Sequence, residues 1–406
     1  MAGQPPDGEP VPADGSLPQQ SLALLDGTPF GVYVHIPFCR TRCGYCDFNT
    51  YTAAELGSGA SRDTYAGLAI AEIRMASRVL AGRAGAVTTV FFGGGTPTLL
   101  PPRDLASILT VIDGELGLAP DAEVTAEANP ETVDERTLAQ LRGSGFTRLS
   151  LGMQSAAPHV LEVLDRVHEP GRPEQCVRWA RAAGLDHVSL DLIYGTPGES
   201  DDDWRLSLRR AIDAGPDHIS AYALIVEEGT RLAARIRRGE LPAPDDDVLA
   251  DRYLIADAML TGAGLSWYEV SNWAAGEQSQ CRHNLLYWTG GNWWGVGPGA
   301  HSHVAGTRWW NVRHPAAYAQ RVSTGGSPGQ ARELLTRAER RTEEIMLLTR
   351  LAAGCPAGAL SPSGLAAARQ AVADGLASEE AFEAGRVELT TQGRLLADAV
   401  IRGLTD

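Results

Sequence analysis

The chain of 406 residues lacks a long apolar run, an excess of positive charge and a dense cysteine pattern. No stretch approaches the roughly eighteen apolar residues that a membrane-spanning helix needs, and the first residues lack a charged segment followed by an apolar core. The net charge of -15 at pH 7 disfavours a broad electrostatic surface for nucleic acid or anionic membranes. We therefore expect a cytoplasmic protein that is not an integral membrane protein and binds no nucleic acid.

Cysteine is scarce and unevenly distributed, which argues against a disulfide framework. Of the 6 cysteines, Cys39, Cys43 and Cys46 lie within one short segment, and the others are scattered at positions 176, 281 and 355. A disulfide within the segment would leave one of its three thiols unpaired. This usage fits a reducing compartment.

The C-x3-C-x2-C segment is the clearest chemical signal in the chain. Three thiolates on one tight loop can bind three irons of a cubic iron-sulfur cluster and leave the fourth iron without a protein ligand. Zinc is the alternative, although a zinc site normally has four ligands. The nearest fourth candidates are poorly placed, since His35 precedes the loop on an apparent strand and Asp47 adjoins Cys46.

Short apolar runs alternate with amphipathic stretches of helical length from residue 31 onward, a pattern typical of β/α units around a parallel sheet. We expect an α/β fold built as a partial (β/α)6 barrel with a smaller C-terminal α+β cap. The predicted strands are 32–36, 88–92, 123–128, 148–154, 187–193 and 218–225. The predicted helices are 61–81, 102–116, 133–142, 173–183 and 201–214. The predicted domains are a disordered segment at 1–28, the barrel with an extension at 29–330 and the cap at 331–406.

Glycines and polar side chains recur at the carboxyl ends of these predicted strands, the end that faces the active site in parallel α/β folds. They are the glycines 93–95 with Thr96, then Glu127, Gln154 and Asp191. The glycines would let a ligand amine approach backbone carbonyls, and the threonine hydroxyl could hydrogen-bond nearby. The alternative is that turns require the glycines and that the two acids form structural salt bridges.

Four motifs are similar to those of one enzyme group. They are Tyr33-Val-His-Ile-Pro-Phe with the cysteines, Gly-Gly-Gly-Thr-Pro-Thr, Leu151-Gly-Met-Gln-Ser and Asp191-Leu-Ile-Tyr-Gly. From residue 31 to the C-terminus the chain resembles the oxygen-independent coproporphyrinogen III oxidase group of radical S-adenosylmethionine proteins. The resemblance implies a [4Fe-4S] cluster on Cys39, Cys43 and Cys46, with S-adenosylmethionine completing the fourth iron. It also implies contacts to S-adenosylmethionine from Tyr33, Tyr45, Gly94, Gly95, Thr96, Glu127, Gln154, Arg166 and Asp191.

One departure from the oxidases changes the expected function. As a family, the oxidases continue the cluster motif to a further cysteine, whereas this chain reads Cys46-Asp47-Phe48. That difference resembles the HemW branch of heme chaperones, which is thought to bind heme and pass it to acceptor proteins. The resemblance therefore makes oxidative decarboxylation of a porphyrinogen doubtful and leaves open whether the protein is an enzyme.

A second segment, Cys281-Arg-His283-Asn-Leu-Leu-Tyr287-Trp288, resembles an H-N-x-x-Y-W motif typical of these chaperones. An imidazole, an amide and flat rings in a glycine-rich loop would suit a porphyrin with an axial ligand. The alternative is that His283 hydrogen-bonds loop backbone and Trp288 packs on the barrel, and the sequence leaves this choice open. His301 and His303 are weaker candidates for the same role.

The cap resembles a small winged-helix domain, a shape that raises the question of DNA binding. Residues 332–406 carry nine arginines, no lysine and eleven acidic residues, the opposite balance from a phosphate-binding surface. We interpret the cap as a lid or a partner surface.

The leading hypothesis is a heme chaperone that carries the cluster and S-adenosylmethionine and delivers heme to acceptor proteins, whether soluble or membrane-bound. The rivals are a coproporphyrinogen III oxidase that tolerates the missing cysteine and a radical enzyme that acts on another substrate. The sequence leaves open the heme ligand, the acceptor and a homodimer.

Overall fold

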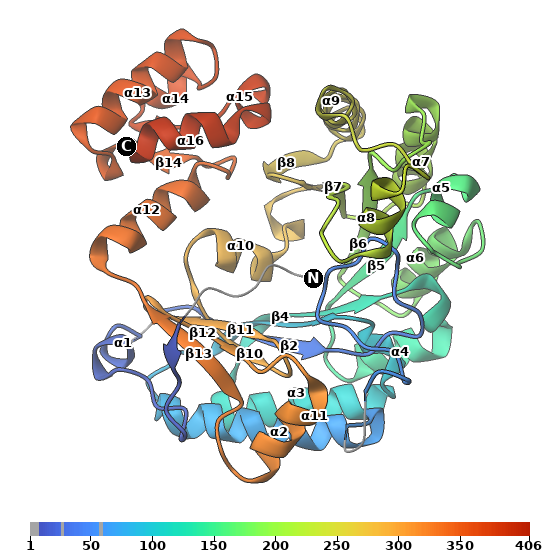
Figure 1. Ribbon diagram of the computed structural model, residues 1–406, viewed down its shortest axis with the longest axis vertical. Helices are drawn as coiled ribbons and strands as arrows, with labels where there is room; N and C mark the ends of the chain where they lie inside the picture. The colour runs from blue at the N-terminus through green and yellow to red at the C-terminus, as the bar shows by residue number, and fades with distance from the viewer. Residues whose placement is uncertain (1–7, 26–27, 57–59) are drawn as a thin grey trace.

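Six parallel strands form the centre of a thirteen-stranded sheet, and each strand is hydrogen-bonded to the next in chain order (Figure 1). This computed structural model describes residues 8–25, 28–56 and 60–406. The six strands are β2 (Phe30–Ile36), β3 (Val87–Gly94), β4 (Leu118–Ala128), β5 (Arg148–Gln154), β6 (His187–Tyr194) and β7 (His218–Ala223). The helices between them are α2 (Arg62–Leu80), α3 (Pro102–Leu116), α4 (Glu135–Gly143), α5 (Pro158–Val163), α6 (Arg172–Ala182) and α7 (Asp201–Asp213). The predicted partial barrel is therefore confirmed.

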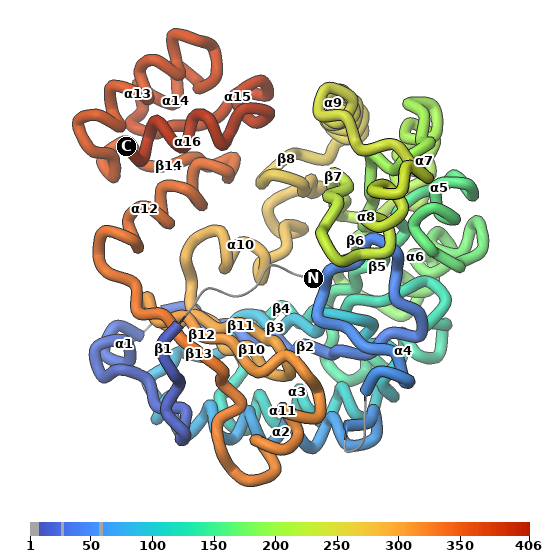
Figure 2. Tube along the Cα trace, in the orientation of Figure 1, coloured from blue at the N-terminus to red at the C-terminus, as the bar shows by residue number. Residues whose placement is uncertain are grey.

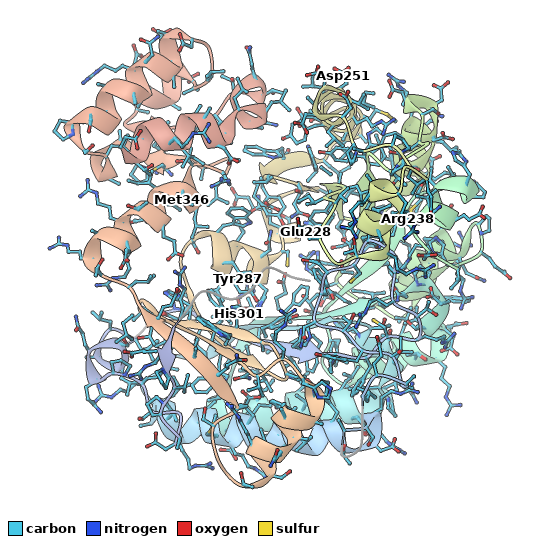
Figure 3. The ribbon with its side chains drawn as sticks, in the orientation of Figure 1. Glu228, Arg238, Asp251, Tyr287, His301 and Met346 are labelled. Atoms are coloured by element: carbon cyan, nitrogen blue, oxygen red, sulfur yellow. The ribbon has the colours of Figure 1, made fainter. Side chains whose placement is uncertain are left out.

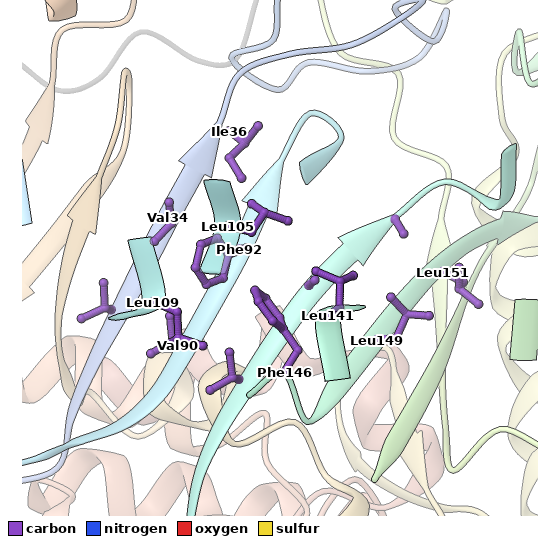
Figure 4. Packing of buried hydrophobic residues seen from close by; sticks show 14 of the residues in the cluster. Val34, Ile36, Val90, Phe92, Leu105, Leu109, Leu141, Phe146, Leu149 and Leu151 are labelled. Carbon is purple, nitrogen blue, oxygen red and sulfur yellow. The ribbon is translucent and has the colours of Figure 1, made fainter. Parts of the chain in front are cut away.

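Local sequence explains why these elements begin where they do. The Ser61 hydroxyl accepts a hydrogen bond from the Thr64 amide and starts α2 with a capping box. The Asp134 carboxylate accepts from the Thr137 amide at 2.7 Å and starts α4. Apolar side chains of the strands meet those of the helices in one continuous core, where the rings of Phe92 and Phe146 lie 5.1 Å apart (Figure 4).

The sheet continues beyond both ends of the six-stranded unit. Next to β2 lie β10 (Asn292–Val296), β11 (His301–Val304), β12 (Thr307–Asn311), β13 (Gly329–Leu334) and β1 (Glu9–Pro10). On the other side, β9 (Asn272–Ala274) pairs with β7 and is followed by β8 (Ser266–Glu269). Only β10 of these additions is parallel to its inner neighbour, so the ends of β2 and β10 open on the same side. Four further helices are α8 (Arg231–Arg237), α9 (Asp246–Gly262), α10 (Arg282–Trp288) and α11 (Pro315–Ser323).

The prediction that residues 1–28 are disordered is wrong for residues 8–25 and for Thr28, and residues 1–7 and 26–27 lie outside the described residues. Strand β1 pairs with β13, and helix α1 (Gln19–Ala23) follows it. Leu17, Leu22 and Leu25 enter the main hydrophobic core, and Leu25 is fully buried. Composition misled the prediction because three leucines among many polar residues suffice to attach the segment.

The C-terminal cap has a hydrophobic core of its own and joins the sheet through α12 (Figure 2). Its elements are α12 (Arg337–Leu348), β14 (Cys355–Pro356), α13 (Pro362–Ala373), α14 (Glu379–Glu383), β15 (Arg386–Val387), α15 (Thr391–Leu395) and α16 (Ala397–Thr405). The predicted boundary at 331 falls inside β13, which belongs to the large sheet. The separate core therefore begins with α12.

Across the described ranges, none of the helices is both long and apolar enough to cross a membrane.

Candidate functional site

The cysteine loop leaves the carboxyl end of β2 and is tied down at several points. The Cys39 amide donates to the Tyr51 carbonyl at 3.0 Å, and the Tyr51 amide donates to the Pro37 carbonyl at 2.7 Å. Farther along, the Leu232 amide of α8 donates to the Gly44 carbonyl at 2.8 Å. These bonds attach the loop both to its own return segment and to the far side of the barrel.

Gly95 explains how the loop approaches the end of β3. A Cβ at this position would lie 2.5 Å from the Phe38 carbonyl oxygen and 3.1 Å from Cys39 Sγ. Contacts that close to backbone are not tolerated, so the Gly-Gly-Gly-Thr motif needs glycine here for packing against the cysteine loop.

The three thiols predicted as cluster ligands are free and partly exposed on one loop. Burial raises the pKa of Cys46 to about 12 and also raises that of Cys39. The guanidinium of Arg166 donates to Cys43 Sγ at 3.6 Å. Within the described part of the chain no three His, Cys, Asp or Glu side chains are grouped to hold a single metal ion.

His35, the candidate fourth zinc ligand, has both ring nitrogens engaged. Its Nδ1 lies 3.0 Å from Tyr33 Oη, and its Nε2 lies 2.9 Å from the Asn49 carbonyl oxygen. Binding zinc would break one of these bonds. The other cysteines are buried away from the loop, and the predicted packing role of Cys176 in α6 agrees with its full burial.

Arg166 connects the loop to the ends of three strands. Its Nη2 donates to Asn129 Oδ1 at 2.8 Å and to the Gly152 carbonyl at 2.9 Å. Asn129 in turn donates to Thr96 Oγ1 at 3.0 Å. Arg166 lies after the end of α5, and its side chain is largely enclosed.

Gln154 ends β5 in an unusual backbone conformation, with φ of 63°. The β5–β6 register shifts between Gly152 and Gln154, and the glutamine side chain occupies the space that a Cβ at Gly152 would need. A non-glycine residue in this region is uncommon and is often found at functional sites. The structure therefore gives a physical reason for the Gly-Met-Gln spacing.

A cavity of about 300 Å³ lies inside the barrel and contains the two predicted carboxylates. We call it the barrel cavity. Glu127 Oε2 accepts from the Gly94 amide at 3.1 Å, and Asp191 accepts from the Ser150 hydroxyl at 2.9 Å. Burial raises the pKa of Glu127 to about 8, with a further increase from Asp191, and burial raises the pKa of Asp191 to about 6. Neither carboxylate forms an ion pair with another described residue, contrary to the salt-bridge alternative.

A second cavity of about 400 Å³ adjoins the first on the side of β10 to β12. We call it the side cavity. Its lining comprises Tyr33, His35, Phe48, Asn49, Gly94, Tyr287, Trp293, Gly299, His301, Trp310, Asn311 and Arg313. Tyr33, Phe48, Gly94 and Tyr287 line both cavities. Sequence reasoning did not bring these segments together, although the clustering of four tryptophans and two histidines between 293 and 310 was a usable signal.

His283 lies on helix α10 and not in the glycine-rich loop that the sequence predicts. Its Nδ1 is 2.8 Å from Thr89 Oγ1, and its Nε2 is 2.8 Å from Tyr287 Oη. The ring stacks on Phe91 with centroids 5.3 Å apart, and the residue is 1% exposed. The alternative in which His283 has a structural role predicted hydrogen bonds to loop backbone. In the structure its hydrogen bonds go to the side chains of Thr89 and Tyr287 instead.

A buried ion pair fixes α10 to the barrel. Arg148 Nε lies 2.9 Å from Glu123 Oε2, and both side chains are almost fully buried. Arg148 also donates to the Ser279 carbonyl at 2.9 Å, while Glu123 accepts from the His283 amide at 3.1 Å. The position of α10, whose Tyr287 lines both cavities, therefore depends on this pair.

The predicted residues converge at one end of the barrel. One contiguous network comprises the cysteine loop, Gly94, Gly95, Thr96, Gln154 and Arg166. The barrel cavity is lined by Tyr33, Glu127 and Asp191. Tyr45 packs beside a small cluster between α5 and α8, where burial raises its pKa. The contacts that these residues make to a ligand remain predictions.

Comparison with known proteins agrees with this arrangement. Residues 33–211 match the radical SAM superfamily. The chain is 53% identical to "Heme chaperone HemW" of Mycobacterium tuberculosis over 94% of this chain and 96% of that protein. It is 36% identical to "Heme chaperone HemW" of Escherichia coli over 72% of this chain and 76% of that protein.

The fold also matches a solved structure of Escherichia coli coproporphyrinogen III oxidase, HemN, described as a radical SAM enzyme. The TM-score is 0.80, with 22% identity, over 97% of this chain and 94% of that one. At this identity the likeness concerns the fold alone. Because the 53% identity to the Mycobacterium tuberculosis HemW extends over 94% of the chain, the protein belongs to the HemW family of the radical SAM superfamily.

Proposed function

We propose that this protein is a heme chaperone that binds heme and transfers it to heme-requiring acceptor proteins in the cytoplasm or at a membrane. The observation that carries the proposal is the 53% identity to a heme chaperone across 94% of the chain. The Asp47-Phe48 pair, which replaces the further cysteine of the oxidases, supports the same branch.

The cysteine loop suits a [4Fe-4S] cluster held by Cys39, Cys43 and Cys46. The three thiols share one loop and are partly exposed, and Cys39 lies against the glycine end of β3. Arg166 would offset part of the negative charge of the thiolates, since its guanidinium already contacts Cys43.

The barrel cavity suits the cationic parts of S-adenosylmethionine, which carries an ammonium and a sulfonium. Glu127 and Asp191 are buried acids without a cationic partner among the described residues, and a cation bound there would stabilise their charged forms. The ligand's orientation would be fixed through hydrogen bonds and packing by Thr96, Gln154, Tyr33 and the backbone at 94–95.

Radical SAM cofactors supply one-electron chemistry on S-adenosylmethionine when cluster and ligand are bound. The chain's own contribution is to hold both groups and exclude water. The proposal assigns a carrier role and leaves turnover to experiment.

Heme transfer tests the proposal directly. The reconstituted protein would be loaded with one equivalent of hemin, separated from free hemin, and mixed anaerobically with an apo-form heme enzyme. We expect the Soret band to move to the acceptor and the acceptor's activity to appear. A protein that binds no hemin, or that never releases it to several acceptors, would contradict the proposal.

The oxidase alternative has a separate readout. Incubation with coproporphyrinogen III, S-adenosylmethionine and a reductant should release no carbon dioxide above the level of a cysteine-loop variant. Stoichiometric carbon dioxide together with protoporphyrinogen IX would replace the chaperone proposal with the oxidase.

A further inference from the structure

The histidines around the side cavity differ in what their ring nitrogens do. Both ring nitrogens of His283 are hydrogen-bonded, to Thr89 and Tyr287. Both ring nitrogens of His35 are likewise hydrogen-bonded, to Tyr33 and Asn49. A ring with both nitrogens hydrogen-bonded in a packed site must lose a bond before it can bind a metal.

His303 is saturated as well. Its Nδ1 lies 2.7 Å from the Gly291 carbonyl oxygen, and its Nε2 accepts from the Gly306 amide at 3.0 Å. These two bonds brace the turn between β11 and β12, and the residue is 8% exposed. His303 is therefore a structural residue of the extension.

His301 is different. Neither of its ring nitrogens has a hydrogen-bond partner within residues 8–25, 28–56 and 60–406, and the residue is exposed at the start of β11. Its ring lies flat against that of Trp310, with centroids 5.8 Å apart and an angle of 26° between the planes. Its backbone carbonyl accepts from Trp293 Nε1 at 2.9 Å, which fixes the strand at this point.

The side cavity around this imidazole has the composition of a site for a flat apolar ligand with acidic groups. Trp293, Tyr287 and Phe48 provide aromatic surface, and Arg313 provides a guanidinium suited to a carboxylate. The volume of about 400 Å³ lies in the range of small-molecule and cofactor sites. Figure 3 labels Tyr287 on α10 and His301 on β11 close to each other, and both residues line the side cavity.

We infer that the side cavity is the heme site and that His301, and not the His283 of the H-N-x-x-Y-W motif, is the axial ligand of the heme iron. The inference rests on the proposed function and assigns its ligand. The imidazole is the usual protein ligand of heme iron, and a coordinate bond from it displaces at most a weakly held water. The porphyrin would lie against Trp293 and Tyr287, with a propionate at Arg313.

Under this inference, the motif acts indirectly. His283 orients Tyr287 through the 2.8 Å contact, and Tyr287 packs edge-on against Trp293 with centroids 4.6 Å apart. His283 is thus a positioning residue for the aromatic wall of the cavity. What His283 contributes is a hydrogen bond, which a glutamine or asparagine side chain can partly replace, whereas neither can replace a histidine as an iron ligand.

Hemin titration of the full chain tests the ligand. We expect His301→Ala to weaken hemin binding by about 10–100-fold and to shift the Soret band, because the iron loses its axial nitrogen. Exogenous imidazole should restore the wild-type spectrum, a rescue that a purely structural role would not give. His303→Ala is the matched control and should keep the spectrum.

His283→Gln separates the two histidines. It should keep the wild-type Soret position and the wild-type ferric heme resonance signal, even if affinity falls a fewfold. Thermal unfolding of each variant identifies any loss that reflects instability. Loss of the ligand signal in His283→Gln with an unchanged spectrum in His301→Ala would overturn the inference, while absence of hemin binding by the wild type would overturn the proposed function itself.

Discussion

The barrel cavity and the side cavity share Tyr33, Phe48, Gly94 and Tyr287 but present opposite chemistry. The barrel cavity displays buried carboxylates, whereas the side cavity displays aromatic rings, an imidazole and Arg313. A cation is favoured in the first and a flat anionic ring system in the second. The difference teaches that one fold can offer two adjoining cavities of unlike chemistry, with Tyr33 and the glycine end of β3 as part of their common lining.

The largest expected effect is the loss of the cluster, and it should leave hemin binding in the side cavity intact. Replacing Cys39, Cys43 or Cys46 with alanine should abolish the visible absorption of the reconstituted cluster, because under the proposal each thiolate binds one iron. Hemin binding in the side cavity should persist in these variants. The Cys176→Ala variant should keep the cluster, and full iron content in all three loop variants would refute the ligand assignment.

The second largest effect concerns the buried ion pair between Arg148 and Glu123. Arg148→Met leaves Glu123 buried without its partner, so we expect the free energy of unfolding to fall by about 3–5 kcal/mol. Urea unfolding measures this loss. The half-exposed Arg142–Asp186 pair, at 3.3 Å, is the control, and Arg142→Met should cost about 1 kcal/mol or less. Equal losses in the two variants would show that the buried pair has no special role.

A smaller effect distinguishes the ligands. Glu127→Gln should weaken S-adenosylmethionine binding by about tenfold, since a charge-assisted contact contributes about 1.5–3 kcal/mol, and should leave hemin affinity unchanged. Wild-type affinity for S-adenosylmethionine should rise from pH 6 to about pH 8, because the raised pKa values mean that these acids ionise only in that range.

The variant should flatten this pH dependence, as calorimetry across the same range would show. The sign for stability is opposite: the folded protein retains protons that an unfolded chain has lost, so the ligand-free protein should become less stable as pH rises toward 8. An unchanged pH profile in Glu127→Gln would mean that this carboxylate does not face the ligand.

The smallest effect concerns the shared wall. Phe48 is 58% exposed and lines both cavities, so Phe48→Ala should weaken each ligand by only about 1 kcal/mol. Titrations of S-adenosylmethionine and hemin with the same variant measure both losses. A loss confined to one ligand would place the phenylalanine in one cavity only.

The sequence predicted what local periodicity determines. The six strands, the five main helices and the convergence of Gly95, Glu127 and Asp191 at one end follow from alternating patterns and from the geometry of parallel sheets. Arg166 was placed by family resemblance alone, because nothing in its neighbourhood indicates that it folds back to Cys43.

The side cavity could not be predicted because it depends on pairing between distant segments. Strand β10 joins β2 across more than two hundred residues of chain, and no local pattern encodes which edge of the sheet it selects. His283 was a stronger candidate than His301 in the sequence, and only the hydrogen bonds of the folded protein reverse that order.

Strand β1 has a consequence for the behaviour of the protein in concentrated solution. Its two residues, Glu9 and Pro10, cover the outer edge of β13, and Arg332 forms an ion pair with Glu9 at 2.7 Å. An uncovered edge of a large sheet is a template for strand addition by a second molecule. Removal of residues 1–28 would therefore expose this edge of β13, and we expect the shortened protein to self-associate more readily.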